Sequence, residues 1–426
     1  MSKAHFGLIG LGVMGENLVL NAERNGFSSV VYNRTYSKTE DFLNGRGKGK
    51  SIDGAKTIQE FVDKLERPRR ILMMVKAGSA TDAVIDNISE YLEEGDLLID
   101  GGNSQFQDTE RRVKQLESKS FGYIGMGVSG GAGHFVKTVH NGIEYGIEQI
   151  LAEAYDLMKR ISKMNCLEMS KVFDLWNQTE ELSSYLVEIT EICLRAKDEL
   201  SGEYVVEKIL DKAGQKGTGL WTVVSALELG VSVPTIYASL NARVMSSLKE
   251  QRKDYESINP LGEFNSFDLG NLSNGMKPLF DAVVLSTIAS YAQGMDILRE
   301  ASNVYKYDLD MQSIAQIWKG GCIIRSKLLK RIQDAYKTDP NLKNLIFDSW
   351  FNMQISTKIN NLAFVVASAN KAGIPLPCMS STLDYLNSYR TSRLPQNLVQ
   401  AMRDCFGSHT YERVDRDGTF HTEWLK

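Results

Sequence analysis

A short segment in the first half of the chain carries several side chains that can donate or accept protons. The segment GHFVKTVHNGIEYG contains Lys137, His140, Asn141, Glu144 and Tyr145. On an α-helix, all five would lie within about 80° of Lys137, on one face. Lys137 and Glu144 would be two turns apart, about 10 Å along the axis, which leaves room for a small substrate. The pattern predicts an acid–base site, and a solvent-exposed polar face is the alternative.

A glycine-rich segment, GVSGG, directly precedes this helix and ends a predicted strand. Ligands of open α/β sheets bind outside the carboxyl ends of the strands. The junction of this strand end with the helix therefore favours a ligand site over a solvent-exposed face.

A second glycine-rich segment lies close to the N-terminus. GLIGLGVMGENL places Gly10, Gly12 and Gly15 between a predicted strand and a predicted helix. The first glycine permits a tight turn, the second lets the backbone approach a pyrophosphate, and the third packs the helix on the strand. The pattern predicts a dinucleotide site at the helix N-terminus, although glycine turns are also common without one. The candidate cofactor-binding residues here are Gly10, Leu11, Gly12, Val13, Met14 and Gly15.

The end of the second predicted strand selects the cofactor. An NAD site needs an acidic residue there, whereas this chain has Asn33, Arg34 and Thr35. A charge-assisted hydrogen bond from Arg34 to a 2′-phosphate contributes about 1.5–3 kcal/mol. The sequence therefore predicts a preference for NADP of about one to two orders of magnitude. An ordinary surface arginine after a strand is the alternative.

Two later strand ends carry small and polar residues. MVKAGSA contains Val75, Lys76 and Ala77, and DGGNS contains Asn103. Both loops are expected at the ligand-binding edge of the sheet, so they are further candidates for cofactor contacts. Either loop alone could be an ordinary turn between a strand and a helix.

The organisation of the chain explains how these residues could meet. Residues 5–127 alternate five short apolar runs with helical patterns, which predicts a parallel sheet of the Rossmann type. After Gly131, long helical periodicity replaces the strand-like runs. We therefore expect an α/β NADP-binding domain at 1–131, a large all-α substrate and dimerisation domain at 132–400, and a C-terminal tail at 401–426.

The helical part contains an internal sequence repeat. LEMSKVFDLW at 167–176 matches LDMQSIAQIW at 309–318, with apolar, acidic and tryptophan positions in register. The match predicts a duplicated helical unit. The last segment mixes one short helix with turn signals, and such a tail usually needs another surface to order it.

Composition limits the possible functions. The net charge of −4 argues against general nucleic-acid binding. Five scattered cysteines without a CxxC pair indicate reduced thiols and a cytoplasmic location. No apolar run is long enough for a membrane span, and the histidines show no metal-ligand spacing.

Together, the motifs resemble those of the decarboxylating 6-phosphogluconate dehydrogenases over essentially the whole chain. The matching segments are GLIGLGVMG, NRT, VKAGSA, DGGNS, GVSGG, GHFVKTVHNGIEYG, GQKGTG and RDCFGSHTYERVDRDGTFHTEW. The resemblance implies a Rossmann domain, a duplicated helical domain and a homodimer whose C-terminal tails cross into the partner. It also implies oxidation of 6-phosphogluconate by NADP in the pentose phosphate pathway, with ribulose 5-phosphate, CO2 and NADPH as products and without a metal.

The resemblance also implies roles for individual residues. Lys137 would take the C3 hydroxyl proton as a neutral base and then polarise the 3-keto group, and Glu144 would protonate C1 of the enediol. Residues that would hold the substrate are Asn103, Ser129, Gly130, Gly131, His140 and Asn141. Residues around its phosphate would be Tyr145, Lys216, Thr218 and Arg243. Tail residues that would reach the neighbouring site are Arg403 and His409.

The chain departs from the family pattern at one junction. In the family, several tens of residues separate the GVSGG strand end from the AGHFVK helix, whereas here Gly131 meets Ala132 directly. This predicts a deletion that leaves five strands instead of six and a poorly covered coenzyme domain. Leu220 also stands where the family pattern has a basic residue.

Two other functions are compatible with parts of the sequence. A related 3-hydroxyacid dehydrogenase would share the glycine-rich start and the helix lysine, but it would not need the phosphate cluster of GQKGTG, Arg243 and the tail. A non-catalytic dimerising isoform, disabled by the deletion, is the other alternative. Formation of NADPH from 6-phosphogluconate separates these possibilities.

Overall fold

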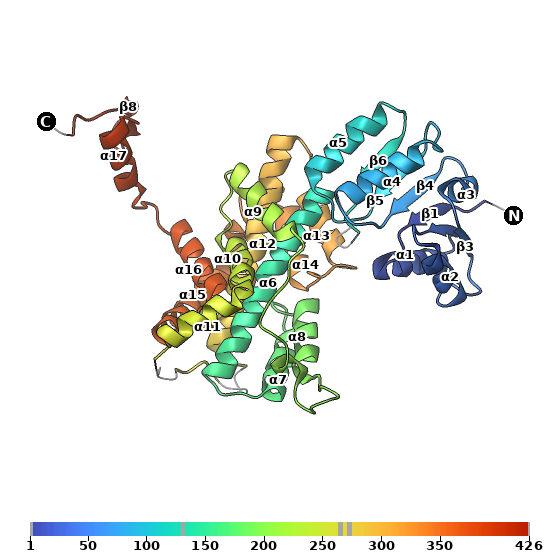
Figure 1. Ribbon diagram of the computed structural model, residues 1–426. Helices are drawn as coiled ribbons and strands as arrows, with labels where there is room; N and C mark the ends of the chain where they lie inside the picture. The colour runs from blue at the N-terminus through green and yellow to red at the C-terminus, as the bar shows by residue number, and fades with distance from the viewer. Residues whose placement is uncertain (1–2, 129–132, 263–266, 271–274, 425–426) are drawn as a thin grey trace.

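The computed structural model describes residues 3–128, 133–262, 267–270 and 275–424. A Rossmann-type domain at the N-terminus is followed by a large helical body, and the C-terminal segment extends from that body as an arm (Figure 1). Among the residues that the structure describes, no helix combines the length and apolar character needed to cross a bilayer.

The N-terminal domain is built on a parallel sheet of six strands in the order β3-β2-β1-β4-β5-β6. This is the order of a dinucleotide-binding sheet. Its strands are β1(Phe6–Ile9), β2(Ser29–Tyr32), β3(Ile52–Ala55), β4(Arg70–Met73), β5(Leu97–Asp100) and β6(Gly122–Gly125). The helices between them are α1(Val13–Arg24), α2(Tyr36–Asn44), α3(Ile58–Asp63), α4(Ser79–Ser89) and α5(Phe106–Glu117).

The sequence-based count of five strands is wrong, because β3 was missed. Asp53 and Gly54 interrupt its apolar run, and only Ile52 and Ala55 are buried. β3 lies at the edge of the sheet, where pairing with β2 rather than a long apolar run holds the strand. The predicted junction of Gly131 and Ala132 lies outside the described residues.

Alternating side chains of the central strands pack on the two faces of the sheet. Leu8 and Val31 belong to the apolar cluster on one face, and Ile9, Val30 and Ile71 belong to the cluster on the other. All five are buried, as expected for a parallel sheet covered by helices on both sides. The sheet is therefore covered on both faces, and its carboxyl edge can carry a cofactor site.

The helical body is centred on two long helices, α6(His134–Arg160) and α12(Lys277–Tyr305). They approach closely through glycines: a Cβ on Gly294 would lie 2.4 Å from the side chain of Ile143, and one on Gly146 would lie 2.7 Å from Ser290 Oγ. The other helices of the body are α7(Cys166–Asn177), α8(Tyr185–Arg195), α9(Thr218–Glu228), α10(Pro234–Ser247), α11(Lys249–Ile258), α13(Met311–Trp318), α14(Leu328–Thr338), α15(Ser349–Lys371) and α16(Pro377–Tyr389).

The predicted duplication agrees with the helix order. A long helix, a helix ending near a buried tryptophan and a third helix occur first as α6–α7–α8 and again as α12–α13–α14. Among the described residues, Trp176 and Trp318 are the two largest fully buried side chains. The two copies meet at an antiparallel bridge between Ser184 and Ser326. These serines are separated in the chain by the same number of positions as the two matching segments of the sequence repeat.

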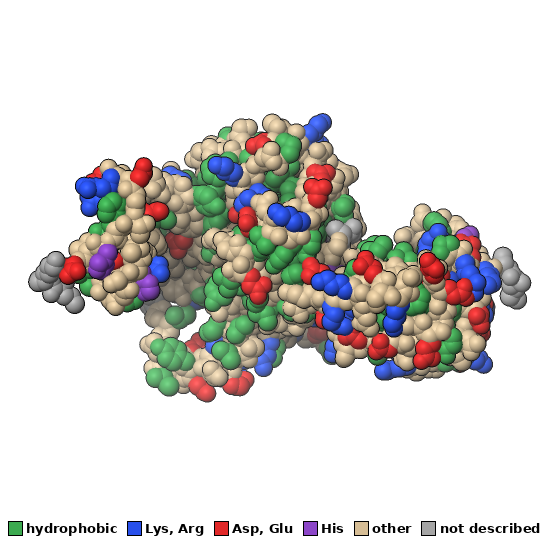
Figure 2. Space-filling view, turned by 90° about the horizontal axis from the view of Figure 1, so that it is seen from above, with side chains coloured by type: hydrophobic (Ala, Val, Ile, Leu, Met, Phe, Trp, Pro, Cys, Tyr) green, Lys and Arg blue, Asp and Glu red, His purple; other side chains and the backbone are tan. Residues whose placement is uncertain are grey.

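The C-terminal arm consists of α17(Gln396–Gly407) and a hairpin of β7(Tyr411–Glu412) and β8(Thr419–Phe420). Asp404 is buried within the arm and accepts hydrogen bonds from the backbone N–H groups of Thr410 and Thr422 and from Nε1 of Trp424. The arm therefore has its own polar centre. Figure 2 shows it as a lobe set apart from the helical body.

Candidate active site

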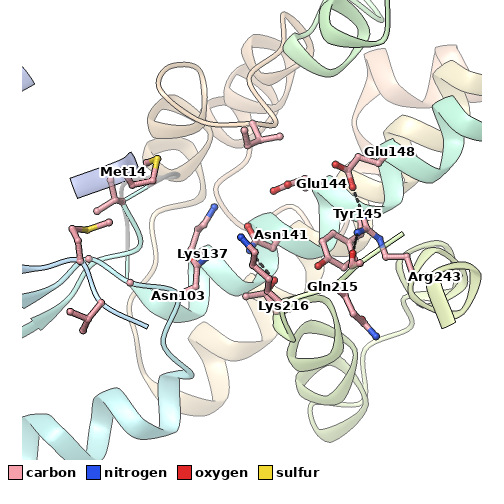
Figure 3. A pocket seen from close by; sticks show the side chains of 18 residues that line it. Met14, Asn103, Lys137, Asn141, Glu144, Tyr145, Glu148, Gln215, Lys216 and Arg243 are labelled. Atoms are coloured by element: carbon pink, nitrogen blue, oxygen red, sulfur yellow. Dashed lines mark hydrogen bonds and ion pairs between the residues drawn. The ribbon is translucent and has the colours of Figure 1, made fainter. Parts of the chain in front are cut away.

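A cavity of about 760 Å³ lies where the carboxyl edge of the sheet meets α6, the segment 214–218 and α10 (Figure 3). It brings together residues that are far apart in the sequence. The predicted site residues that line it are Met14, Val75, Asn103, Lys137, Asn141, Glu144, Tyr145, Lys216, Thr218 and Arg243.

Helix α6 positions the two predicted acid–base residues. Its apolar side chains, such as Val139 and Ile143, are fully buried and fix the rotation of the helix. Lys137 and Glu144 consequently face the same cavity. The close approach of the backbone at position 127 needs a glycine, because a Cβ on Gly127 would lie 2.3 Å from Cβ of Lys137.

Burial brings the pKa values of this pair close to neutrality. Lys137 is 5% exposed, and burial lowers its pKa to about 8 although the charge of Glu144 opposes this. Burial, followed by the charge of Glu148, raises the pKa of Glu144 to about 7, against the effects of Lys137 and Arg243. A neutral lysine and a protonated carboxyl group are therefore both accessible near neutral pH.

A hydrogen-bond chain connects Lys137 to α9. Nζ of Lys137 lies 3.2 Å from Nδ1 of His140, which lies 3.0 Å from Oδ1 of Asn141. Nδ2 of Asn141 donates to Oγ1 of Thr218 at 2.9 Å. Burial and the charge of Lys137 lower the pKa of His140 to about 3, so its ring is neutral. This neutral chain fixes the lysine without giving it a close counter-ion.

The far end of the cavity is basic. The guanidinium of Arg243 lies over the ring of Tyr145, with its Cζ 3.6 Å from the ring centroid, and it pairs with the carboxylate of Glu148. Lys216 also lines this end. Arginine and lysine together with a tyrosine are suited to a phosphate group.

A second cavity, of about 430 Å³, lies along the glycine-rich turn. The predicted cofactor residues that line it are Gly10, Leu11, Gly12, Asn33, Arg34, Thr35, Val75 and Lys76. Lys38 lines it as well and was not predicted. Met74 and Val75 border both cavities, so a ligand could extend from one to the other.

The glycine-rich turn fits a dinucleotide. Gly10 has a φ of +103°, and a Cβ there would lie 2.4 Å from the carbonyl oxygen of Met74. A Cβ on Gly15 would lie 2.1 Å from the carbonyl oxygen of Gly10, so the helix packs directly on the turn. Gly12 faces open space at the N-terminus of α1, where a pyrophosphate could approach the free N–H groups.

Comparison with known proteins identifies the family. The family model of the NAD binding domain of 6-phosphogluconate dehydrogenase matches residues 5–170, and that of the C-terminal domain matches residues 133–424. The chain belongs to the decarboxylating 6-phosphogluconate dehydrogenases. Its activity is therefore the NADP-dependent oxidative decarboxylation of the pentose phosphate pathway.

The chain aligns with individual relatives from end to end. The chain is 48% identical to the decarboxylating 6-phosphogluconate dehydrogenase of Synechococcus elongatus and 44% identical to the NADP(+)-dependent one of Bacillus subtilis, with 100% of both chains covered in each case. A 6-phosphogluconate dehydrogenase from Plasmodium falciparum, solved in apo form and in complexes with NADP+ and with 6-phosphogluconate, matches with a TM-score of 0.93. That pair is 39% identical, and the match covers 99% of this chain and 100% of the other.

The comparison confirms the sequence-based family, fold class and cofactor. The Synechococcus alignment has 474 positions against 426 residues, which leaves at least 48 positions without a residue of this chain. That the missing residues lie between Gly131 and Ala132 stays a prediction.

Some of the predicted site residues do not border the two cavities. His140 is 0% exposed and contacts Lys137 from within the core instead. Arg403 and His409 belong to the C-terminal arm and are not among the residues that line either cavity. Val13, Gly15 and Ala77 are also not among the described lining residues. Ser129, Gly130 and Gly131 lie outside the described residues.

Several residues that line the main cavity were not predicted from the sequence: Met74, Gly101, Gly102, Val128, Glu148, Gly214, Gln215 and Ile323. Glu148 could have been found, because it lies three turns after Lys137 and within about 20° of it on the helix. In the described residues, no group of three or more His, Cys, Asp or Glu side chains could hold a metal ion.

Proposed function

We propose that Lys137 is the general base and Glu144 the general acid of the decarboxylating dehydrogenase reaction. The observation that carries this proposal is that both side chains face one cavity from one helix, with pKa values of about 8 and about 7. Groups that titrate near the working pH are the most effective proton carriers.

The proposed roles follow the movement of protons. Neutral Lys137 accepts the proton of the C3 hydroxyl group, and bound NADP supplies the hydride acceptor at this cavity. The resulting ammonium donates to the 3-keto oxygen and stabilises the electron pair that stays when the C1–C2 bond breaks and CO2 leaves. Protonated Glu144 then gives its proton to the carbon that lost the carboxylate.

We infer that the remaining cavity residues orient the substrate. Asn103 and Asn141 border the cavity near Lys137 and can bond to hydroxyl groups, whereas Tyr145, Lys216 and Arg243 lie at the end suited to the phosphate. This local basic cluster explains how a chain with a net charge of −4 can hold an anion. Thr218 supports the site through its bond to Asn141.

For the cofactor, we propose that Arg34 and Lys38 bind the 2′-phosphate of NADP. Both line the second cavity: Arg34 follows β2, where NAD enzymes carry an acidic residue, and Lys38 lies in the first turn of α2. Asn33 has a different role, because its Oδ1 accepts from the backbone N–H of Leu11 at 3.1 Å. It therefore holds the glycine-rich turn against the end of β2.

We further propose a homodimer with exchanged arms. The arm extends from the body, and α17 exposes the large apolar side chains of Leu398, Met402 and Phe406. A partner subunit that covers them would stabilise the arm. Arg403 and His409 would then reach the phosphate site of the partner subunit. They would not reach the phosphate site of their own chain, because the arm extends away from the helical body.

We keep the domain limits inferred from the sequence as part of this proposal: 1–131 for the cofactor, 132–400 for the substrate and dimer, and 401–426 for the exchanged tail. All five cysteines are free thiols, which supports our proposal of a cytoplasmic location.

An assay of the purified chain tests the proposed site. We expect NADPH formation with 6-phosphogluconate and none with 3-hydroxyisobutyrate, a substrate without a phosphate. Turnover of 3-hydroxyisobutyrate that survives Arg243→Ala would instead favour a 3-hydroxyacid dehydrogenase site.

A further inference from the structure

A second carboxylate lies one helical turn beyond the proposed acid. Glu148 and Glu144 are spaced i,i+4 on α6, and both border the main cavity. Figure 3 shows Glu148 beyond Glu144, with Arg243 reaching toward it from α10. The site thus contains a carboxylate that the proposed proton transfers do not use.

Arg243 is held on three sides. Its Nη2 pairs with Glu148, its Nη1 donates to the carbonyl oxygen of Gly214 at 2.7 Å, and its guanidinium stacks on Tyr145. The Arg243 side chain is 16% exposed, and that of Glu148 is 37% exposed. The guanidinium proposed to bind the substrate's phosphate therefore already has an anionic partner within the chain.

We propose that Glu148 is an internal counter-ion that the substrate's phosphate displaces from Arg243, and that this exchange helps to keep Glu144 protonated in the loaded site. The proposal rests on the proposed function, because it takes Arg243 as the phosphate ligand. It assigns Glu148 a positioning role, since Glu148 acts through Arg243 and Glu144 rather than on the reacting atoms.

The surrounding charges give the direction of the effect. Lys137 on α6 and Arg243 on α10 favour ionised Glu144, whereas Glu148 disfavours it. Nδ1 of the neutral His140 ring lies 3.6 Å from Oε2 of Glu144, Lys216 borders the same cavity, and Cys322 lies near both Lys137 and Glu144. Burial raises the pKa of Glu148 too, and Arg243 opposes that rise.

A phosphate that accepts the hydrogen bonds of Arg243 separates the guanidinium from the carboxylate of Glu148. The negative charge of Glu148 is then compensated less, and the phosphate adds further negative charge. Both effects favour one more proton on the pair of Glu144 and Glu148. Substrate binding would thus supply the protonated acid that decarboxylation consumes.

The decisive variant is Glu148→Gln, which keeps the shape and an acceptor for Arg243 but removes the charge. We expect 6-phosphogluconate, titrated by calorimetry without NADP, to bind about three- to tenfold more tightly, because no anion competes for Arg243. At pH 7–8, kcat should fall about three- to tenfold, because Glu144 loses its proton more easily. A structural role would weaken binding instead.

The pH profile adds a readout that a loss of packing would not produce. The productive form has neutral Lys137 and protonated Glu144, and Lys137 has the higher pKa of the two. A lower pKa of Glu144 therefore reduces the fraction of molecules in the productive form. It also moves the acid limb of the kcat profile to lower pH, by about half to one unit. The alkaline limb should stay in place. Glu148→Asp, which retains the charge, should restore most of the wild-type profile. Glu188→Gln, an exposed neutralisation on α8, is the matched control and should change neither quantity.

Wild-type protein provides a test that does not depend on a variant. Titration at pH 7.5 in two buffers of different ionisation enthalpy should show proton uptake on binding of 6-phosphogluconate, and Glu148→Gln should reduce it. Weaker or unchanged binding by Glu148→Gln, or the absence of proton uptake by the wild type, would overturn the proposal. If Arg243→Ala leaves binding unchanged, the phosphate assignment itself fails. If Arg243→Ala weakens binding and Glu148→Gln has no effect, only the counter-ion role fails.

Discussion

Nζ of Lys137 lies 3.2 Å from Nδ1 of His140, and both side chains are buried. The neutral imidazole, packed edge-on against Trp318 with ring centroids 5.9 Å apart, gives the lysine a partner without negative charge. Burial is therefore not offset by a carboxylate in direct contact, and the pKa of Lys137 falls to about 8. This relationship makes a lysine usable as a base near neutral pH.

Replacement of the base should abolish most of the activity without unfolding the chain. Lys137→Met retains the apolar stem that packs on Gly127 but has no amine. We expect kcat to fall by about 10²–10⁴. The measurement is NADPH formation under saturating substrate, with circular dichroism to confirm the fold. A variant with nearly wild-type turnover would exclude Lys137 as the base.

The pH dependence of kcat should be bell-shaped. The reaction needs neutral Lys137, with a pKa of about 8, and protonated Glu144, with a pKa of about 7, so the rate rises and then falls with pH, with limbs near 7 and 8. Because the base has the higher pKa, only about 6% of the molecules carry the productive pair at the optimum.

Glu144→Gln should change the shape of this profile as well as its height. Its rate should be about 10²–10⁴ lower, and the alkaline limb should disappear because no acid remains to be deprotonated. The remaining acid limb reports the deprotonation of Lys137, and its midpoint should lie slightly below pH 8, since the charge of Glu144 no longer raises the pKa of Lys137. A residual rate that still falls at high pH would assign the acid to another group.

The choice of cofactor should depend on two cations. Arg34→Ala should weaken the binding of NADP by about 10- to 100-fold and the binding of NAD much less, because only NADP has a 2′-phosphate. Lys38→Ala should have an effect in the same direction but smaller, since an ammonium makes no bidentate contact. Fluorescence titration of both cofactors measures this ratio. Equal losses for NADP and NAD would contradict the assignment.

The arm should be required for assembly. Phe406 is 74% exposed on α17, so Phe406→Asp should place a charge in the proposed dimer interface. We expect the dimer dissociation constant to rise by about 10-fold or more, measured by sedimentation equilibrium. Leu200→Asp, at a residue that is 97% exposed outside the arm, is the matched control. An unchanged dimer in the Phe406 variant would place the interface elsewhere.

The sequence alone was sufficient for features that depend on local backbone periodicity. Gly10, Gly12 and Gly15 reveal a strand–turn–helix unit because each glycine is needed within a few residues of the others. Lys137 and Glu144 could be placed on one face because a helix repeats every 3.6 residues. For the same reason the duplicated helices and the helical character of the second domain could be predicted.

Other features are set by contacts between distant segments. β3 has a weak local pattern, and it becomes a strand because β2 pairs with it. His140 packs against Trp318 from another helix, and the partner of Arg243 is a glutamate on another helix. The pKa values of Lys137 and Glu144 likewise follow from how deeply each group is packed. The residue types and their local order were therefore determined by the sequence, whereas the charge state and the partners of each group were decided by the tertiary structure, because desolvation and Coulomb interactions depend on distances across the fold.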